Sequence, residues 1–331
     1  MSDAAMGVGA GGTRRVQVSS ILPAETLARM RTRIPFMGAM MILHAWALIA
    51  LAIAMVDWTP ALHWSLLIVT VPLAIMVVGS RQLGLSILLH EGAHGCMARN
   101  PSVNMAISQW FCAYPVFADT KTYRDYHLSH HAHAQTMKDP DLILSAPFPV
   151  TAASFRRKML RDLTGQTGFK QRRAQLKAAL GVPGSGFAAR LKVFVSKLGG
   201  PLAANAVILA AMIAAGVWWA YPLLWIFPLI SWQQAVTRVR NIAEHALIPV
   251  DGDPLGVART TQANWITRLF LAPYYVNYHA EHHFMMYVPC YNLPKLHGAL
   301  MASGAKERFV VSATYRDILK RAASKGVMLA A

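Results

Sequence analysis

Acidic residues and cysteine are both scarce in this chain of 331 residues. It holds 15 Asp and Glu against 32 Lys and Arg, and only 3 Cys. No two cysteines form a Cys-x-x-Cys pair, so the sequence indicates neither a disulfide framework nor a thiolate metal site. Cys96, Cys112 and Cys290 are compatible with a reducing compartment and with small core positions. Charged residues make up only 14% of the chain, which is too few for an ordinary soluble domain.

Apolar residues dominate instead, at 55% of the chain with a mean hydropathy of +0.34. Four runs without a charge are suited to crossing a bilayer, namely residues 35–56, 63–80, 202–219 and 223–236. The sequence therefore predicts an all-α integral membrane protein. Its four transmembrane helices would form two hairpins, with a cytosolic helical cap that carries the histidines described below.

Three regions follow from this pattern. Residues 1–34 are expected to be a flexible cytosolic N-terminal tail, because residues 1–20 are rich in Gly, Ala and Ser and contain no apolar signal segment. Residues 35–300 would form the membrane domain, and residues 301–331 a cytosolic C-terminal tail. Within the domain, residues 103–118 suggest a re-entrant or interfacial helix. The second span is expected to continue as helix beyond Arg81, which could snorkel at the interface.

The positive charge is concentrated between the two predicted hairpins. Residues 119–197 contain fourteen Lys and Arg against five Asp, whereas the two short outer turns contain no Lys or Arg. This distribution follows the positive-inside rule, which places the segment in the cytosol. Basic clusters can also bind nucleic acid, but beside membrane spans they favour anionic headgroups or an acidic protein partner.

Histidine is the residue type that carries the chemistry. Nine of the 13 histidines fall into four short motifs, and helical spacing places the members of each motif on one face. Imidazole is the commonest metal ligand in proteins. The candidate metal ligands are these nine histidines and one neighbouring asparagine: His90, His94, His127, His130, His131, Asn241, His245, His279, His282 and His283.

The motifs repeat along the chain. Each half runs as a hairpin, then a pair of candidate ligands on the extended second helix, then a His-x-x-His-His cluster. This parallel predicts two similar half-sites, each carrying much of one metal's coordination. Imidazole alone does not choose among Fe, Zn, Cu and Ni. The word His90-Glu91-x-x-His94 also matches a zinc hydrolase signature, in which Glu91 would be the general base, but that chemistry leaves six clustered histidines without a role.

Several polar residues near these motifs are weighed separately. An acidic residue beside a ligand histidine either orients another histidine or pairs with Arg124, Arg238 or Arg240; this applies to Glu91, Asp125, Glu244 and Glu281. His133 is rotated away from its cluster and is expected to be polar surface. His44, His63 and His297 are not predicted to be ligands.

Together these motifs resemble the three histidine boxes of the membrane fatty acid desaturase and hydroxylase superfamily. His90-x3-His94, His127-x2-His130-His131 and His279-x2-His282-His283 are similar to the boxes. Asn241-x3-His245 resembles the additional ligand pair of the stearoyl-CoA desaturases, where the asparagine reaches iron through water. The resemblance covers roughly residues 36–300. Within the superfamily the chain looks closest to short bacterial members similar to the rhizobitoxine desaturases, and more distantly resembles carotenoid ketolases.

The resemblance implies a centre of two Fe ions, with O2 as co-substrate, that attacks an unactivated C–H bond. It implies a fatty acyl or lipid desaturase, with a lipid, sphingolipid or carotenoid hydroxylase or ketolase as the alternative in the same superfamily. A membrane zinc hydrolase and a metal transport or storage protein remain the alternatives from other classes. The exact substrate, including a small amino-acid-like compound, stays open.

Partners and location follow from the same reasoning. No cytochrome-like His-Pro-Gly-Gly word is present, so a separate ferredoxin, rubredoxin or cytochrome is expected to supply electrons. A basic cytosolic face suits an acidic donor. No nucleic acid partner is expected. The protein is expected in the bacterial inner (plasma) membrane with its active site on the cytosolic side.

Overall fold

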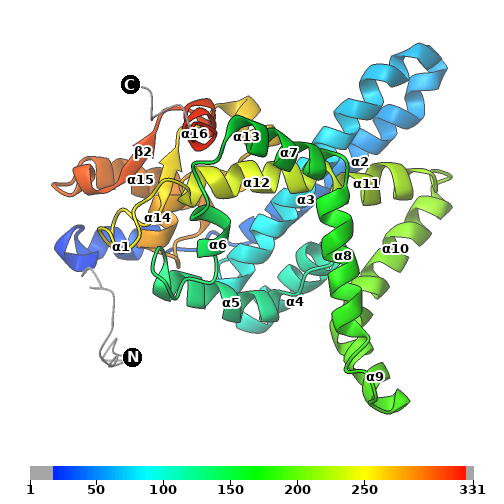
Figure 1. The fold of residues 1–331 in the computed structure, drawn as a ribbon, viewed down its shortest axis with the longest axis horizontal. Coiled ribbons are helices and arrows are strands. Elements are labelled where there is room, and N and C mark those ends of the chain that lie inside the picture. Colours follow the sequence, from blue (N-terminus) through cyan, green and yellow to red (C-terminus); the bar gives the residue numbers. More distant parts are fainter. Residues whose placement is uncertain (1–17, 326–331) are drawn as a thin grey trace.

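The computed structural model describes residues 18–325 and is mostly helical. Two short parallel strands, β1 (Arg259–Thr261) and β2 (Val310–Ser312), add a small sheet to the predicted all-α fold. In Figure 1 the α2–α3 hairpin extends beyond the rest of the molecule at the upper right, while α14 and α15 lie at the opposite end. The molecule therefore has an apolar end made of long helices and an opposite end made of short helices and loops.

The first hairpin consists of α2 (Met37–Leu62) and α3 (Leu67–Ala93), joined through the short helix η2 (Trp64–Leu66). Large apolar side chains near its tip, including Trp58, Leu62 and Ile68, are exposed, as expected of a surface that meets lipid. The prediction that the second span continues as helix beyond Arg81 is confirmed, because α3 runs on to Ala93. This extension carries His90 and brings His94 to the helix end.

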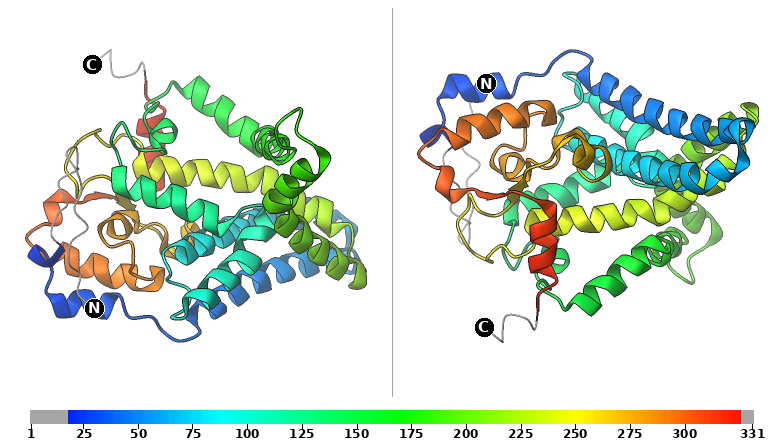
Figure 2. Two further views of the ribbon diagram at one scale, coloured as in Figure 1. Left: turned by 90° about the horizontal axis from the view of Figure 1, so that it is seen from below. Right: turned by 90° about the horizontal axis from the view of Figure 1, so that it is seen from above.

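The second apolar region differs from its expected bounds. One continuous helical stretch contains α9 (Phe187–Phe194), η5 (Val195–Gly199) and α10 (Gly200–Ala214), so it begins before residue 202 and ends before residue 219. It ends near Gly216, whose φ of +76° suits a residue without a Cβ. Both views of Figure 2 show α10 at the same end of the molecule as the α2–α3 hairpin, and α10 packs against the segment at residues 109–116.

The expected fourth span at 223–236 is divided among three elements. These are η6 (Tyr221–Ile226), α11 (Phe227–Ile230) and α12 (Trp232–His245). Ser231 interrupts the helix with φ of −116° and ψ of −88°. Among the described residues, three helices are long and apolar enough to cross a membrane: 37–62, 64–93 and 187–214. The fourth predicted crossing is not one of them.

Arg81 does not snorkel. Its side chain is 3% exposed, and its guanidinium donates hydrogen bonds to the carbonyl oxygens of Leu269 and Arg268. These carbonyls lie at the end of α13 (Trp265–Phe270), which packs against α3. Burying a charge requires hydrogen-bonding partners, and here the backbone provides them. The arginine thus joins α3 to the C-terminal part of the chain.

Most of the remaining helices form the end of the molecule that holds the histidines. In chain order they include α4 (Pro101–Ser108), η3 (Gln109–Ala113), η4 (Tyr114–Val116), α5 (Thr120–His133), α6 (Leu142–Ser145), α7 (Ala152–Leu163), α8 (Gln166–Ala179), η7 (Pro273–Tyr275), α14 (His279–Phe284), η8 (Cys290–Asn292), α15 (Leu293–Met301) and η9 (Lys306–Arg308). Of these helices, α8 instead packs against α11 and η5. The segment expected as a re-entrant helix, residues 103–118, is thus a series of short helical pieces.

Parts of both predicted tails are folded. The helix α1 (Ala24–Met30) buries Leu27 and Met30, while residues 1–17 lie outside the described residues. At the other end, β2 pairs with β1, and α16 (Tyr315–Ala322) packs its buried face against α12. Within the described residues, the segment expected as a cytosolic C-terminal tail thus contains β2 and the amphipathic helix α16.

Gly92 lies between two candidate ligands on α3, where α4 approaches closely. A Cβ at this position would overlap the side chain of Ser108. We expect Gly92→Ala to destabilise the protein by about 1–3 kcal/mol, because overpacking forces backbone shifts. Gly298→Ala is the control: it lies inside α15, an added Cβ there would have no neighbour within 4 Å, and alanine favours helix. Thermal unfolding of both purified variants measures the difference; equal melting temperatures would contradict the packing argument.

Candidate metal centre

Four elements bring the nine histidines together. The end of α3 supplies His90 and His94, α5 supplies His127, His130 and His131, the end of α12 supplies His245, and α14 supplies His279, His282 and His283. α3 and α12 both extend from the apolar end and pack against each other, so their last turns reach the same level. α5 and α14 then close over these turns with their own histidines.

The nine imidazoles divide into two groups whose ligand atoms lie within 4.8 Å of one another. The first group is His90, His94, His127, His131 and His282; the second is His130, His245, His279 and His283. The two groups adjoin, because neighbours such as His131 and His283 belong to different groups and have ring centroids 4.3 Å apart. This arrangement offers two adjacent metal positions.

The distances between ring nitrogens fit metal coordination. His131 Nε2 lies 3.0 Å from Nε2 of both His127 and His282, and His279 Nε2 lies 2.9 Å from that of His245 and 3.2 Å from that of His283. Two nitrogens bound to one ion at roughly 2.1 Å, at a right angle, lie about 3 Å apart. A neutral imidazole has only one N–H and one acceptor nitrogen, so these contacts cannot all be good hydrogen bonds. A central cation satisfies all of them together.

Buried nitrogens without partners point the same way. Both ring nitrogens of His90 and of His94, and Nδ1 of His282, have no hydrogen-bond partner among the described residues, although all three side chains are buried. Unpaired buried polar groups are costly and uncommon in a folded protein. Metal binding through one nitrogen of His90 and one of His94 would account for two of these five atoms.

The electrostatics favour neutral imidazoles. Burial lowers the pKa of His245 to about 3, and burial also lowers the pKa of His94 to about 3, with the Arg124 charge acting in the same direction. Both rings are therefore neutral at pH 7, which leaves a nitrogen lone pair available to a metal. The donor set of imidazoles with no thiolate suits Fe, Zn, Cu or Ni.

Each half of the chain supplies most of one group, as the half-site interpretation predicted. Two histidines are exceptions: His282, from the last motif, lies in the first group, and His130, from the second motif, lies in the second group. Neighbouring histidines on α5 and α14 point to different positions because residues one apart on a helix are rotated by about 100°.

Comparison with known proteins identifies the chain. The profile of the fatty acid desaturase family matches residues 62–315, which include all nine histidines. The chain belongs to the fatty acid desaturase family. It is also similar to a dihydrorhizobitoxine desaturase from Bradyrhizobium elkanii, at 27% identity over 270 residues, covering 78% of this chain and 74% of that protein. The family and the three apolar helices support a membrane oxidoreductase of the desaturase type.

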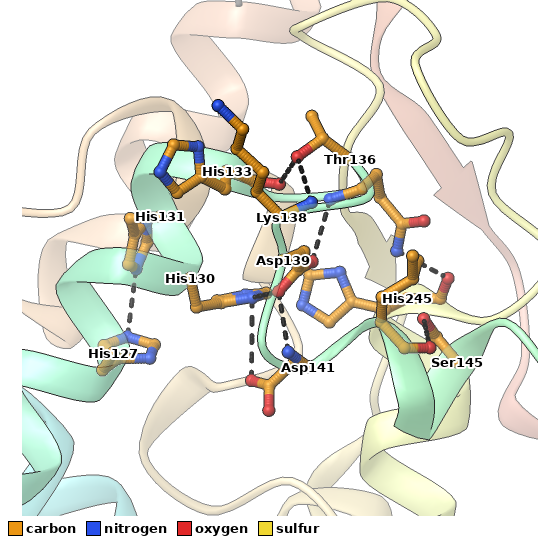
Figure 3. Close-up of polar contacts among 12 residues, drawn as sticks. His127, His130, His131, His133, Thr136, Lys138, Asp139, Asp141, Ser145 and His245 are labelled. Atoms are coloured by element: carbon orange, nitrogen blue, oxygen red, sulfur yellow. Dashed lines mark hydrogen bonds and ion pairs between the residues drawn. The ribbon is translucent and has the colours of Figure 1, made fainter.

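In this desaturase-family protein, acidic groups and carbonyl oxygens hold several rings in place. His130 Nδ1 lies 2.7 Å from Asp139 Oδ1, so a proton on Nδ1 leaves Nε2 free to face the second group (Figure 3). His245 Nδ1 likewise lies 3.1 Å from the carbonyl oxygen of Val257. Such contacts fix the tautomer and orientation of ligand histidines. Asp139 follows the second motif in sequence, but nothing in the sequence pattern assigns it this contact.

The acidic neighbours of the ligands have different roles. Glu91 accepts a hydrogen bond from the backbone N–H of Cys290 at 2.8 Å. Glu244 forms an ion pair with Arg240 at 2.6 Å, and pairing with an arginine was one of the two predicted alternatives. Its other carboxylate oxygen lies 3.5 Å from His279 Nε2. Asp125 is exposed on α5.

Glu281, the acidic residue of the last motif, contacts residues outside the two histidine groups. Glu281 is completely buried and accepts hydrogen bonds from His297, at 2.6 Å, and from Thr260. His297 is thus a partner of Glu281, and it belongs to neither histidine group. These contacts anchor α14, and with it three of the nine histidines, to β1 and α15.

Asn241 lies one helical turn before His245 on α12 and lines the same cavity as four of the histidines. This cavity has a volume of about 370 Å³ and is bounded by His127, His130, His245 and His279. The Asn241 amide therefore lies on the side of the histidine groups that faces this cavity. His44 and His63 lie in α2 and at its end, and His133 belongs to neither histidine group.

We expect paired substitutions to separate the two metal positions. The double substitution His130→Ala with His245→Ala removes two ligands from the second group only. Of the two metal ions expected per chain, about one should therefore remain tightly bound. His127→Ala with His130→Ala removes one ligand from each group and should weaken both. Elemental analysis after chelator treatment measures the metal content. If the ligands were divided strictly by chain halves, the His127/His130 variant would keep one ion and the His130/His245 variant would weaken both. Observing that result would contradict the assignment of His130 to the second group.

Asp139→Asn tests the support of His130. The amide cannot provide the same charged acceptor, so we expect metal affinity at the second position to fall about 10–100-fold. Asp125→Asn is the matched control, because Asp125 lies on the same helix as His130, is exposed and belongs to neither group. Metal competition with a chelator gives both affinities. Equal affinities in the two variants would show that the carboxylate does not position the ring.

Proposed function

We propose that this protein is an O2-dependent membrane oxidoreductase with a di-iron centre, which introduces a C=C bond into a fatty acyl or lipid-derived substrate. The observation that carries the proposal is the pair of adjacent, buried, all-imidazole groups in a chain of the fatty acid desaturase family. A single zinc ion needs three or four ligands, whereas nine converging histidines suit two ions.

The proposed ligands are His90, His94, His127, His131 and His282 for one ion, and His130, His245, His279 and His283 for the other, with Asn241 beside the second. Two ferrous ions held by these residues would activate O2 for attack on an unactivated C–H bond. In desaturation, two hydrogen atoms leave adjacent carbons, and two electrons from a donor together with two protons complete the conversion of O2 to two water molecules.

The chain's own residues provide position and exclude water. Neutral imidazoles hold the ions, and the contact from Asp139 keeps His130 turned toward its ion. The cavity beside Asn241 provides a place for the substrate next to the metals, and the surrounding buried helices limit access of water. These are roles of binding and orientation, and none requires an acid or base to deprotonate carbon.

The contacts of Glu91 favour this oxidoreductase over a zinc hydrolase. A hydrolase would need Glu91 to be a general base directed at a metal-bound water. One carboxylate oxygen of Glu91 is instead engaged by the backbone N–H of Cys290, which fixes the loop before α15. Glu91 is also buried on α3, away from the two cavities that border the histidines.

We further propose a topology with the histidine-bearing end in the cytosol of a bacterial cell and the tips of both hairpins on the other side of the inner membrane. η6, α11 and the start of α12 would complete a fourth crossing within a membrane domain spanning residues 35–300. The basic segment at 119–197 supports this orientation. A separate ferredoxin, rubredoxin or cytochrome would deliver electrons to this face.

The decisive experiment compares Glu91→Gln with His130→Ala. Glutamine can still accept the hydrogen bond from Cys290 but cannot be a base, so the oxidoreductase should keep most of its activity, whereas a hydrolase would lose several orders of magnitude. His130→Ala opens the coordination of one ion and should abolish activity. The assay is O2-dependent conversion of lipid in host membranes with their own electron donor, followed by mass spectrometry of the lipids. Full activity in His130→Ala would end the di-iron proposal.

A further inference from the structure

The cavity that reaches the metal centre has a polar wall. Eighteen residues line it, and only four of them are aliphatic: Leu83, Leu89, Ala118 and Leu144. By contrast, an entirely apolar cavity of about 430 Å³, bounded by residues such as Trp46, Trp110 and Val207, touches none of the nine histidines. An unsubstituted acyl chain along the row of polar side chains that α12 contributes to this cavity would leave the buried hydroxyl of Thr237 without a partner, which is unfavourable.

The polar groups are arranged in a line that leads to the metals. Gln233, Thr237, Asn241 and His245 lie at intervals of four on α12, so they share one face of the helix. The first three line the cavity together with His245. The hydroxyl of Thr237 is buried and has no hydrogen-bond partner among the described residues. Threonine in a helix occupies two rotamers, so one rotation can present this hydroxyl to a bound molecule.

A second cavity continues this space outward. It has a volume of about 290 Å³ and shares Leu144, Thr237 and Asn241 with the first. Lys158 and Arg238 line it as well. The two cavities thus adjoin at Leu144, Thr237 and Asn241.

The outer cavity carries a positive charge that the protein does not neutralise. Arg238 pairs with Asp162, whose carboxylate also accepts a hydrogen bond from Thr167. Lys158 has no ion-pair partner within 4 Å among the described residues. Arg238 precedes His245 by seven residues, a rise of roughly 10 Å along α12. Along the axis of α12, the outer cavity at Arg238 is therefore about 10 Å from the level of His245.

We propose that the substrate carries an anionic group that binds Lys158. Between that group and the carbon that is oxidised, it carries hydrogen-bonding atoms that contact Thr237 and its neighbours on α12. This rests on the proposed function and narrows its substrate class. The substrate is a polar-substituted acid or phosphate and differs from a plain saturated acyl chain. Thr237 is then a specificity-determining residue.

A third cavity provides the competing location. It has a volume of about 320 Å³, touches His131 and His283, and is lined mainly by apolar residues such as Leu255, Phe284 and Met285. A substrate bound there would not contact Thr237 or Lys158, which belong to the other two cavities. Substitutions of these two residues therefore distinguish the locations.

The test measures binding to purified full-length protein by thermal stabilisation. The probes are decanoate and a panel of decanoates with one amino or hydroxyl group at carbon 2, 3 or 5. At least one substituted acid should bind about tenfold more tightly than decanoate, the effect of one good hydrogen bond. Thr237→Val should remove this preference, and Thr237→Ser, which keeps a hydroxyl, should retain it. Thr164→Val makes the same change at an exposed position and should have no effect.

The role of the Lys158 charge is tested by substitution on α7. Lys158→Gln should weaken binding of every acid about tenfold, whereas Arg156→Gln, at an exposed position on the same helix, should not. Phosphatidate vesicles, tested alongside, distinguish a lipid phosphate from a free carboxylate as the anion. Decanoate binding as tightly as every substituted acid, or preference unchanged by Thr237→Val, overturns the proposal. Conversion of the bound acids in the presence of O2 and a donor is measured separately. Thr237-dependent binding without conversion would refute the proposed function and leave this inference standing.

Discussion

The crowding of nine imidazoles into one buried space is the constraint on which the rest of the structure depends. Ring nitrogens about 3 Å apart are unfavourable neighbours unless a cation lies between them or hydrogen bonds connect them. The protein collects these rings from four helices that are distant in sequence. Contacts such as those of the buried Arg81 on α3 and of Glu281 on α14 hold those helices at fixed separations. The fold therefore supports two adjacent imidazole groups that could each hold a metal ion.

Much of this support could be predicted from the sequence. Charge-free runs identified the first hairpin, and the absence of a break after residue 80 indicated that α3 would carry His90 and His94 toward the other ligands. Helical spacing gathered the histidines of each motif, and the motif combination indicated the family that the comparison then identified. These features are local, so periodicity and composition are enough to find them.

What the sequence could not provide depends on contacts between distant segments. The division of histidines into groups follows from how α5 and α14 face each other, and a single-motif pattern carries no information on that packing. The break at Ser231 and the burial of Arg81 are likewise set by neighbouring elements. The role of Asp139 arises from a loop that folds back onto α5, and that of His297 arises from the packing of α15 against α14. The amphipathic α16 could have been found, because Tyr315, Ile318 and Ala322 follow helical spacing.

The interleaved histidine groups have a consequence for biogenesis. Four of the five ligands in the first group belong to α3 and α5, and they leave the ribosome well before α14 is made. Three of the four in the second group come from α12 and α14. Most of the first group is therefore made in the first half of the chain, whereas the second group needs the helices of the second half. The two groups use the same kind of ligand, but they are completed at different stages of synthesis.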